Sequence, residues 1–142
     1  MATTAQRFQA AVEQRDHAAL TDLFSPDIRF YSPVKFRPFK GRDMVLGLFG
    51  VLLRTFEDFE YLGSLDGAVT TRTDGAETPA TVLPFLARVG EHQIHGIDLL
   101  HFDADGRISE FTVMVRPQSA AQALSAAVYA GLVADGLVPA AQ

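Results

Sequence analysis

The amino-acid sequence predicts an α+β domain in which helices cover one face of a curved antiparallel sheet. Apolar residues recur at helical spacing in the first part of the chain, and strand-like runs separated by glycine-containing turns follow from residue 59 onward. The chain has 142 residues, of which 48% are hydrophobic and 20% are charged. A chain of this size and composition is typical of one domain, so we expect a single domain over residues 1–142 with a core, or a core that surrounds a pocket.

The chain is expected to open with two short amphipathic helices. Apolar residues recur at spacings of three and four on both sides of a break near Arg15 and Asp16. They are Phe8, Ala11, Val12, Leu20, Leu23 and Phe24. The turn-forming run Ser25-Pro26-Asp27 is expected to end the second helix.

A short strand and a longer helix are expected next. Residues 28–32 alternate apolar and polar side chains, which is typical of a strand, and residues 35–40 are expected to form a loop. After Gly41, apolar residues at i, i+3, i+4, i+7 and i+11 predict a helix, with Asp43 in the first turn, where the helix dipole favours a carboxylate. The apolar set of this helix is Val45, Leu48, Phe49, Leu52 and Phe56.

The second half of the chain predicts an antiparallel meander. Turns such as Asp105-Gly106 separate runs rich in β-branched and aromatic residues, the longest at about residues 78–89, 93–102 and 107–115. Pro117 ends the last run. The Ala-rich segment that follows has an apolar residue at every fourth position, which predicts an additional C-terminal helix over residues 117–136.

The inner face of the sheet is predicted from the position of Asp98. Side chains alternate along a strand, so Asp98 shares a face with its apolar neighbours two and four residues away. The inward set is then Leu83, Phe85, Ala87, Ile94, Asp98, Leu100, Phe102, Phe111, Val113 and Val115. The outward set is Val82, Pro84, Leu86, His95, Ile97, Leu99, His101, Glu110, Thr112 and Met114. This mixed outer face is of the kind that pairs with a second copy, so we expect a homodimer through the outer sheet face.

Charge and cysteine content exclude several classes of function. Twelve Lys and Arg residues against 17 Asp and Glu residues give a net charge of −5, the wrong sign for binding nucleic acid by phosphate neutralisation. Without cysteine, the chain has no disulfide, thiolate nucleophile or cysteine-bound metal, which suits a cytoplasmic protein. We expect no secretory signal and no membrane-spanning segment. Nucleotide-binding, serine hydrolase and zincin motifs do not occur, and no cofactor is expected.

Four motifs occur in the order typical of one family. They are Tyr31-Ser32-Pro33, Gly41-Arg42-Asp43, Leu83-Pro84-Phe85 and the run Ile-Asp-Leu-Leu-His-Phe-Asp-Ala-Asp-Gly-Arg-Ile at residues 97–108. With these motifs in register over about residues 5–116, the chain resembles the nuclear transport factor 2-like superfamily, in its branch of ketosteroid isomerases and SnoaL-like polyketide cyclases. The resemblance implies a conical α+β barrel whose curved sheet wraps a long helix. It also implies an apolar pocket at the wide end of the cone.

The chain departs from the ketosteroid isomerase pattern at two functional positions. That enzyme has a tyrosine in its first helix, an aspartate base at the end of its first strand and a protonated aspartate in a later strand. The resemblance places Phe8, Ser32 and Asp98 at these positions, so only the third carboxyl group is kept. In ketosteroid isomerase, that carboxylic acid stays neutral and donates a hydrogen bond to a developing oxyanion. Without the other two groups the same proton shuttle cannot operate, and conventional steroid isomerisation is not expected.

Asp98 is therefore the predicted catalytic residue. A carboxyl group among Ile94, Leu100 and Phe102 loses hydration, which favours its neutral form and suits an acid, a base or an oxyanion donor. The alternatives are a carboxylate satisfied by a donor inside a vestigial pocket and a carboxylate that faces water. The residues predicted to bind a substrate are Ser32, Tyr31, Phe8, Phe49, Phe85, Leu100, Phe111 and Val113.

Histidines and a basic segment complete the set of polar candidates. His95 and His101 share one strand face and are expected at the surface or in an interface, while His92 lies on the other parity, so no metal site is predicted. Four cations lie within eight residues, interleaved with two phenylalanines, after the first strand. They are Lys35, Arg37, Lys40 and Arg42, with Phe36 and Phe39. The segment is either a rim that steers an anionic ligand, such as a carboxylate or a CoA ester, or a solvated loop whose aromatics fill the core.

Two functions remain open from the sequence. The first is binding of a small apolar carbonyl-bearing or polycyclic ligand, with cofactor-free acid–base chemistry of the isomerase, cyclase or hydratase type through Asp98. The second is a noncatalytic ligand-binding or dimeric scaffold domain whose pocket is filled by phenylalanine side chains. A cavity near Asp98 would favour the first function, and a solid core would favour the second.

Overall fold

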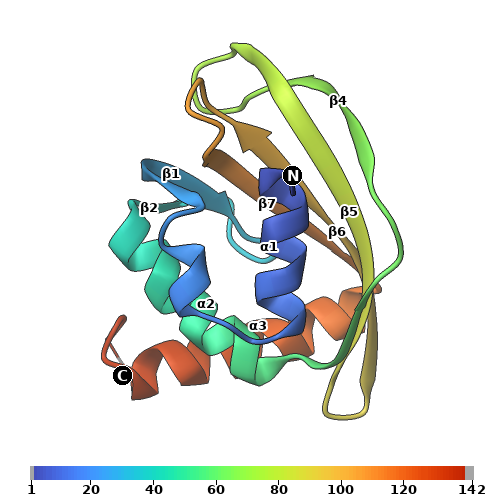
Figure 1. Ribbon diagram of the computed structural model, residues 1–142. Helices are drawn as coiled ribbons and strands as arrows, with labels where there is room; N and C mark the ends of the chain where they lie inside the picture. The colour runs from blue at the N-terminus through green and yellow to red at the C-terminus, as the bar shows by residue number, and fades with distance from the viewer. Residues whose placement is uncertain (1, 140–142) are drawn as a thin grey trace.

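Helices and one seven-stranded sheet make up the computed structural model, which describes residues 2–139 (Figure 1). The helices are α1 (Thr4–Glu13), α2 (Arg42–Thr55) and α3 (Gln118–Ala134), with a 3-10 turn at Ala18–Leu20. The strands are β1 (Phe24–Tyr31), β2 (Phe39–Lys40), β3 (Glu57–Tyr61), β4 (Leu65–Thr70), β5 (Glu77–Val89), β6 (His92–Phe102) and β7 (Ile108–Arg116). The predicted α+β class is confirmed.

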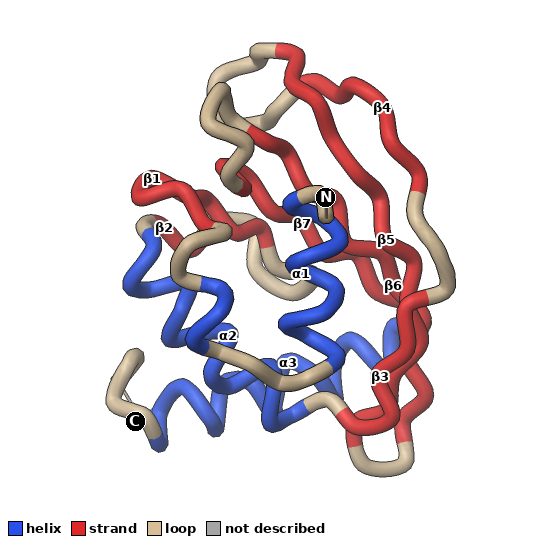
Figure 2. Tube along the Cα trace, viewed as in Figure 1, coloured by secondary structure: helices blue, strands red, loops and turns tan. Residues whose placement is uncertain are grey.

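The sheet is curved, mixed and open. Its strand order is β2-β1-β7-β6-β5-β3, with β4 also paired to β5, and it bends around α1 (Figure 2). Strands β5, β6 and β7 are antiparallel neighbours, as predicted. Strand β1 runs parallel to β7, so the expectation of an antiparallel sheet throughout is wrong. The two strands start side by side, since the Ile108 amide donates to the Leu23 carbonyl at 2.8 Å. The sheet does not close between β2 and β3, so the barrel is incomplete.

Strand β1 begins earlier than the sequence predicts. The first predicted helix is present as α1, but the second is only the 3-10 turn, and Phe24 already belongs to β1. The turn-forming run Ser25-Pro26-Asp27 lies within the strand, next to an irregularity in its pairing with β7. Strand β2 pairs only with Arg29 and Phe30, so β1 is an edge strand at Pro26, where a missing amide donor is tolerated.

Helix α2 occupies the range that the sequence predicts, and its buried face meets the centre of the core. Five phenylalanine rings pack there: Phe8, Phe24, Phe30, Phe49 and Phe111. The ring centroid of Phe111 lies 5.2 Å from that of Phe8, 5.1 Å from that of Phe30 and 5.5 Å from that of Phe49. These contacts join β7 to α1, β1 and α2, so one aromatic cluster holds the helices against the sheet.

Helix α3 confirms the predicted C-terminal helix and packs across α2. Arg54 of α2 forms hydrogen bonds of 2.9 Å to both carboxylate oxygens of Asp135. At Gly131 a Cβ atom would come within 2.5 Å of Val51, so the glycine permits close approach of the two helices. Within residues 2–139, no helix is long and apolar enough to cross a membrane.

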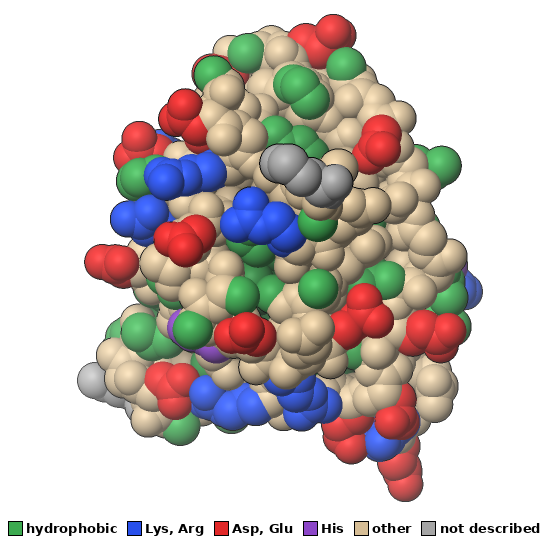
Figure 3. Space-filling view, in the orientation of Figure 1, with side chains coloured by type: hydrophobic (Ala, Val, Ile, Leu, Met, Phe, Trp, Pro, Cys, Tyr) green, Lys and Arg blue, Asp and Glu red, His purple; other side chains and the backbone are tan. Residues whose placement is uncertain are grey.

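The inner and outer faces of the sheet follow the predicted alternation. Asp98 is 5% exposed and lies on the inner face with the buried Ile94 and Leu100. On the outer face, Leu86 and Met114 are 41% and 55% exposed. Figure 3 shows Lys and Arg side chains over β1 and β2, and acidic side chains near β3 and the tip of the β5–β6 hairpin.

Candidate functional site

A cavity of about 230 Å³ lies between the inner face of the sheet and the three helices. Its lining is mostly apolar and comes from α1, β1, β2, α2, β3, β6, β7, α3 and the loop after β1. The polar residues in the lining are Ser32, Lys35, Tyr61, Asp98, Ser125 and Tyr129. The core is therefore not packed solid around Asp98, in contrast to the alternative of a pocket filled by phenylalanine side chains.

Asp98 projects into this cavity from the middle of β6. Its cross-strand partners are Leu83 on β5 and Val113 on β7, so apolar side chains flank it on both sides. Burial raises the pKa of Asp98 to about 7, although the hydrogen bond from Tyr61 acts in the opposite direction. At neutral pH the carboxyl group thus populates both its neutral and its ionised form.

Tyr61 is the partner of Asp98 in the site. Its hydroxyl donates to Asp98 Oδ2 at 2.9 Å. Burial raises the pKa of Tyr61 well above its ordinary value, and the nearby Asp98 raises it further, so the phenol stays protonated. In the described part of the chain, this is the one hydrogen bond that reaches Asp98, which leaves Oδ1 free to contact a ligand.

The position of Tyr61 depends on irregular pairing at the edge of the sheet. Strand β3 pairs with β5 through a register shift between Glu57 and Glu60, and Tyr61 then lies opposite Phe85. The ring of Phe85 covers Gly96, where a Cβ atom would come within 2.7 Å of it. Sequence reasoning missed Tyr61, because the only local signal was a tyrosine two residues after Phe59 in a strand-like run.

The structure brings some of the predicted substrate-binding residues to the cavity and places others elsewhere. Ser32 and the apolar residues Phe8, Phe49, Phe111 and Val113 line the cavity with Asp98. Phe85 and Leu100 are buried beside it without lining it. Tyr31 points to the opposite face of the sheet, where its hydroxyl lies 3.3 Å from that of Thr73.

Ser32 has a structural role in addition to its place in the lining. Its Oγ accepts a hydrogen bond from the Lys35 amide at 3.1 Å and so closes the turn after β1. The hydroxyl hydrogen remains free for a ligand acceptor. No histidine lines the cavity among the described residues, so Ser32 lacks the histidine base that commonly activates a serine nucleophile.

Helix α3 closes one side of the cavity. Five of its residues line the space: Leu124, Ser125, Val128, Tyr129 and Leu132. These residues place the helix over the cavity. The Tyr129 hydroxyl donates to the Pro139 carbonyl at 3.0 Å, which fixes the ring near the C-terminal end of the described chain.

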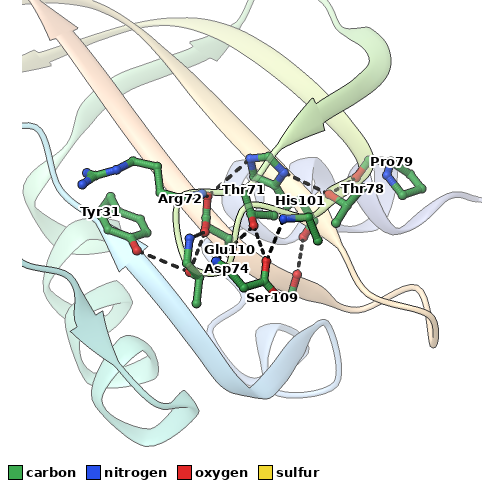
Figure 4. Close-up of polar contacts among 11 residues, drawn as sticks. Tyr31, Thr71, Arg72, Asp74, Thr78, Pro79, His101, Ser109 and Glu110 are labelled. Carbon is green, nitrogen blue, oxygen red and sulfur yellow. Dashed lines mark hydrogen bonds and ion pairs between the residues drawn. The ribbon is translucent and has the colours of Figure 1, made fainter.

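A second buried polar cluster lies on the outer face of the sheet (Figure 4). Glu110 accepts hydrogen bonds from the Arg72 amide, the Thr73 amide and the Thr73 hydroxyl at 3.1, 3.0 and 2.6 Å. His101 lies 3.5 Å from Glu110 and 3.0 Å from the Thr78 hydroxyl. Burial lowers the pKa of His101, although Glu110 acts in the opposite direction.

His101 is buried in this cluster, so the expectation that it is a surface or interface residue is wrong. His101 and Glu110 are 1% and 2% exposed because the segment between β4 and β5 covers them. The strand face on which His101 lies was predicted correctly, but the segment that covers this residue could not be predicted. His101 lies on the face opposite Asp98 and takes no part in the site. In the region that the structure describes, no group of three or more His, Cys, Asp or Glu side chains is placed to hold a metal ion.

The fold and a buried carboxyl group in an apolar cavity define a member of the nuclear transport factor 2-like class. The SnoaL-like domain family matches residues 5–111, and the chain belongs to this family. Among curated protein sequences, none matches this chain.

Solved structures agree with this assignment over nearly the whole chain. A steroid delta-isomerase from Pseudomonas aeruginosa is 37% identical, with a TM-score of 0.82, and the match covers 95% of this chain and 93% of that one. An uncharacterised protein with a cystatin-like fold from Silicibacter pomeroyi is 28% identical, with a TM-score of 0.82 and coverage of 94% and 87%. A structure from Shewanella denitrificans named for a SnoaL-like polyketide cyclase has 17% identity and a TM-score of 0.59, with coverage of 87% and 95%, and it supports the fold alone.

Proposed function

We propose that this protein binds a small apolar carbonyl compound in the cavity and moves a proton to and from it through Asp98, without a cofactor. The observation that carries the proposal is the pair of Asp98 and Tyr61 at the wall of an apolar cavity, with Oδ2 held by the phenol. An acid–base group works best when its pKa lies near the working pH, which favours Asp98 at neutral pH.

The proposed reaction needs one carboxyl group and one hydrogen-bond donor. Ionised Asp98 takes a proton from a carbon next to the carbonyl, and the electron pair of the C–H bond moves into the carbonyl to form an enolate. Neutral Asp98 then returns a proton to the same carbon, which re-forms the starting compound, or to oxygen, which gives the enol. Where the enolate is conjugated with a C=C bond, return of the proton to a more distant carbon shifts that double bond. Tyr61 donates to Oδ2 throughout and stabilises the ionised form of Asp98.

The size of the cavity limits the ligand. An apolar cavity of about 150 Å³ holds benzene, and pockets for drug-sized ligands measure about 300–1,000 Å³. At about 230 Å³, the cavity fits a molecule of one or two rings. The similar Pseudomonas aeruginosa structure is named a steroid delta-isomerase, but a four-ring substrate would extend beyond this space. We therefore propose a substrate smaller than a steroid.

Deuterium exchange tests proton transfer directly. The two-ring ketone 2-tetralone has acidic C–H groups next to its carbonyl, and its exchange in D₂O near neutral pD is followed by NMR. We expect the protein to accelerate exchange, Asp98→Asn to reduce the rate to that of buffer, and Tyr61→Phe to give an intermediate rate. Asp105→Asn, an exposed aspartate in a turn, is the matched control and should retain the parent rate.

Binding is measured separately with 2-naphthol, by its stabilisation of the folded chain. A shift in melting temperature that Asp98→Asn removes supports occupancy of the cavity. Binding that depends on Asp98 without any accelerated exchange would support the noncatalytic alternative. An unaltered melting temperature together with buffer-level exchange would contradict both binding and catalysis.

We also propose that the outer sheet face pairs with a second copy of the chain. Large apolar side chains are exposed there on the two strands that flank β6, with Leu86 on β5 and Met114 on β7. A twofold dimer would bury the same patch on both copies. Light scattering after size exclusion should give twice the chain mass of 15.4 kDa, and Met114→Lys should give the chain mass. A monomeric parent chain at micromolar concentration would contradict this proposal.

A further inference from the structure

Lys35 places a positive charge at the cavity. It is the one Lys or Arg residue in the cavity lining within residues 2–139. Its Nζ lies 4.3 Å from the centroid of the Phe39 ring, and Phe39 lines the same cavity. A cation over a ring face is attracted by the ring, so this contact favours the ammonium group near the lining. The ion pairs among the described residues do not include Lys35, so its charge is available to a ligand.

The cavity opens where Lys35 lies. Val34, Ser125 and Tyr129 line both the cavity and an open depression along α3. The remaining lining of that depression is Gln118, Ala121, Gln122 and Ala126. The mouth thus lies between the loop after β1 and α3, and its polar groups are a cation, hydroxyls and amides. Among the described residues that line the cavity or the depression, Asp98 is the only one with a carboxyl side chain.

The loop after β1 that carries Lys35 is locally basic although the chain carries a net charge of −5. Arg37 and Lys40 follow in the same segment, and Lys40 pairs in register with Arg29 of β1. Arg72 contacts the same loop from the outer face of the sheet, with its guanidinium 4.6 Å from the centroid of Phe36 and 4.9 Å from that of Tyr31. Figure 3 shows basic side chains over β1 and β2, with acidic side chains beside them. Such a local excess of positive charge attracts anions to the loop that borders the opening.

The two ends of the cavity therefore favour different ligand groups. At the inner wall, an anionic ligand group would face the partly ionised Asp98 in apolar surroundings, which is unfavourable. At the mouth, the same group would remain hydrated and meet Lys35. We propose that the substrate is a one- or two-ring compound with its reacting carbonyl at Asp98 and a carboxylate at its other end, bound by Lys35. This inference rests on the proposed function and adds the class of substrate.

Three matched ligands test the inference. 6-Hydroxy-2-naphthoic acid carries a phenol and a carboxylate at opposite ends. In 6-hydroxy-2-naphthamide a neutral amide replaces the carboxylate. The third ligand, 2-naphthol, keeps the phenol and has neither the carboxylate nor the amide. Dissociation constants are measured by calorimetry at low and high salt. We expect the acid to bind about three- to tenfold more tightly than the amide at low salt, with a smaller ratio at high salt, as for a partly exposed charged hydrogen bond.

The variants separate Lys35 from its neighbours. Lys35→Met keeps an apolar stem and should abolish the preference for the acid, whereas Lys35→Arg should retain it. Arg37→Met removes a cation of the same loop that does not line the cavity, and we expect the preference to persist. An equal affinity for acid and amide in the parent chain, or a preference that survives Lys35→Met, would overturn the inference.

The uncharged ligand distinguishes this inference from the proposed function. Binding of 2-naphthol does not involve a carboxylate, so its dependence on Asp98 reports on the inner end of the cavity alone. If 2-naphthol binds in an Asp98-dependent way and the acid shows no preference, the substrate class is wrong while the proposed function stands. If 2-naphthol does not bind and exchange of 2-tetralone is not accelerated, the proposed function itself fails.

Discussion

Relative to the Asp98→Asn variant, the parent chain should lose about 4 kcal/mol of stability as the pH rises from 4 to 8, because the pKa of Asp98 is raised to about 7 in the folded state. Between pH 4 and 7, the unfolded chain has released this proton while the folded chain retains it. The unfolded state then binds fewer protons, and stability falls with rising pH. Above pH 7 both states are ionised, and the difference between the chains should level off.

Urea denaturation of both chains at half-unit steps of pH measures this difference. Asparagine can still accept the hydrogen bond from Tyr61 but cannot ionise, so the comparison isolates the titration of one group. Asp105→Asn serves as the control, since this exposed aspartate lies outside the cavity. A difference between parent and Asp98→Asn that stays constant over the pH range would show that Asp98 is hydrated in the folded state.

Phe111→Ala should cost about 3–5 kcal/mol of stability, the range typical of a buried phenylalanine. Phe111 is 1% exposed, and its ring contacts those of Phe8, Phe30 and Phe49. The substitution therefore leaves a void at the junction of α1, β1 and α2. Because Phe111 also lines the cavity, part of the void should join it, and we expect larger ligands to bind.

Denaturant unfolding and a series of ligands of increasing size check both expectations. Phe36→Ala is the control, because that side chain is 80% exposed and its removal should change stability by no more than about 0.5 kcal/mol. Phe111→Leu removes fewer atoms and provides a milder variant if Phe111→Ala does not fold. A loss below about 1 kcal/mol for Phe111→Ala would mean that the aromatic cluster is less tightly packed than these distances indicate.

The parts of the fold that depend on local patterns could be predicted from the sequence. Helix α2, helix α3 and the three long strands follow from helical spacing, alternation and glycine turns. The early start of β1 could not be predicted, because Ser25-Pro26-Asp27 is locally a turn and becomes a strand only by pairing with β7. The parallel pairing of β1 and β7 joins distant segments and has no local signal.

The candidate site, too, could be predicted only in part from the sequence. The burial of Asp98 could be predicted, because its neighbours two and four residues away share its strand face. Tyr61 could not, since its approach to Asp98 depends on the register shift in β3. The burial of His101 was missed for a similar reason, because a segment from β4 and β5 crosses an otherwise open face.

The pairing of β1 with β7 also sets when the chain can fold during synthesis. Strand β1 and helix α1 leave the ribosome long before Phe111, so Phe8 and Phe30 lack this packing partner for most of translation. Contacts between distant segments slow folding, and exposed aromatic surface favours aggregation in the meantime. We therefore expect truncated chains that end before β7 to associate or to be degraded, and native structure to form only once β7 has emerged.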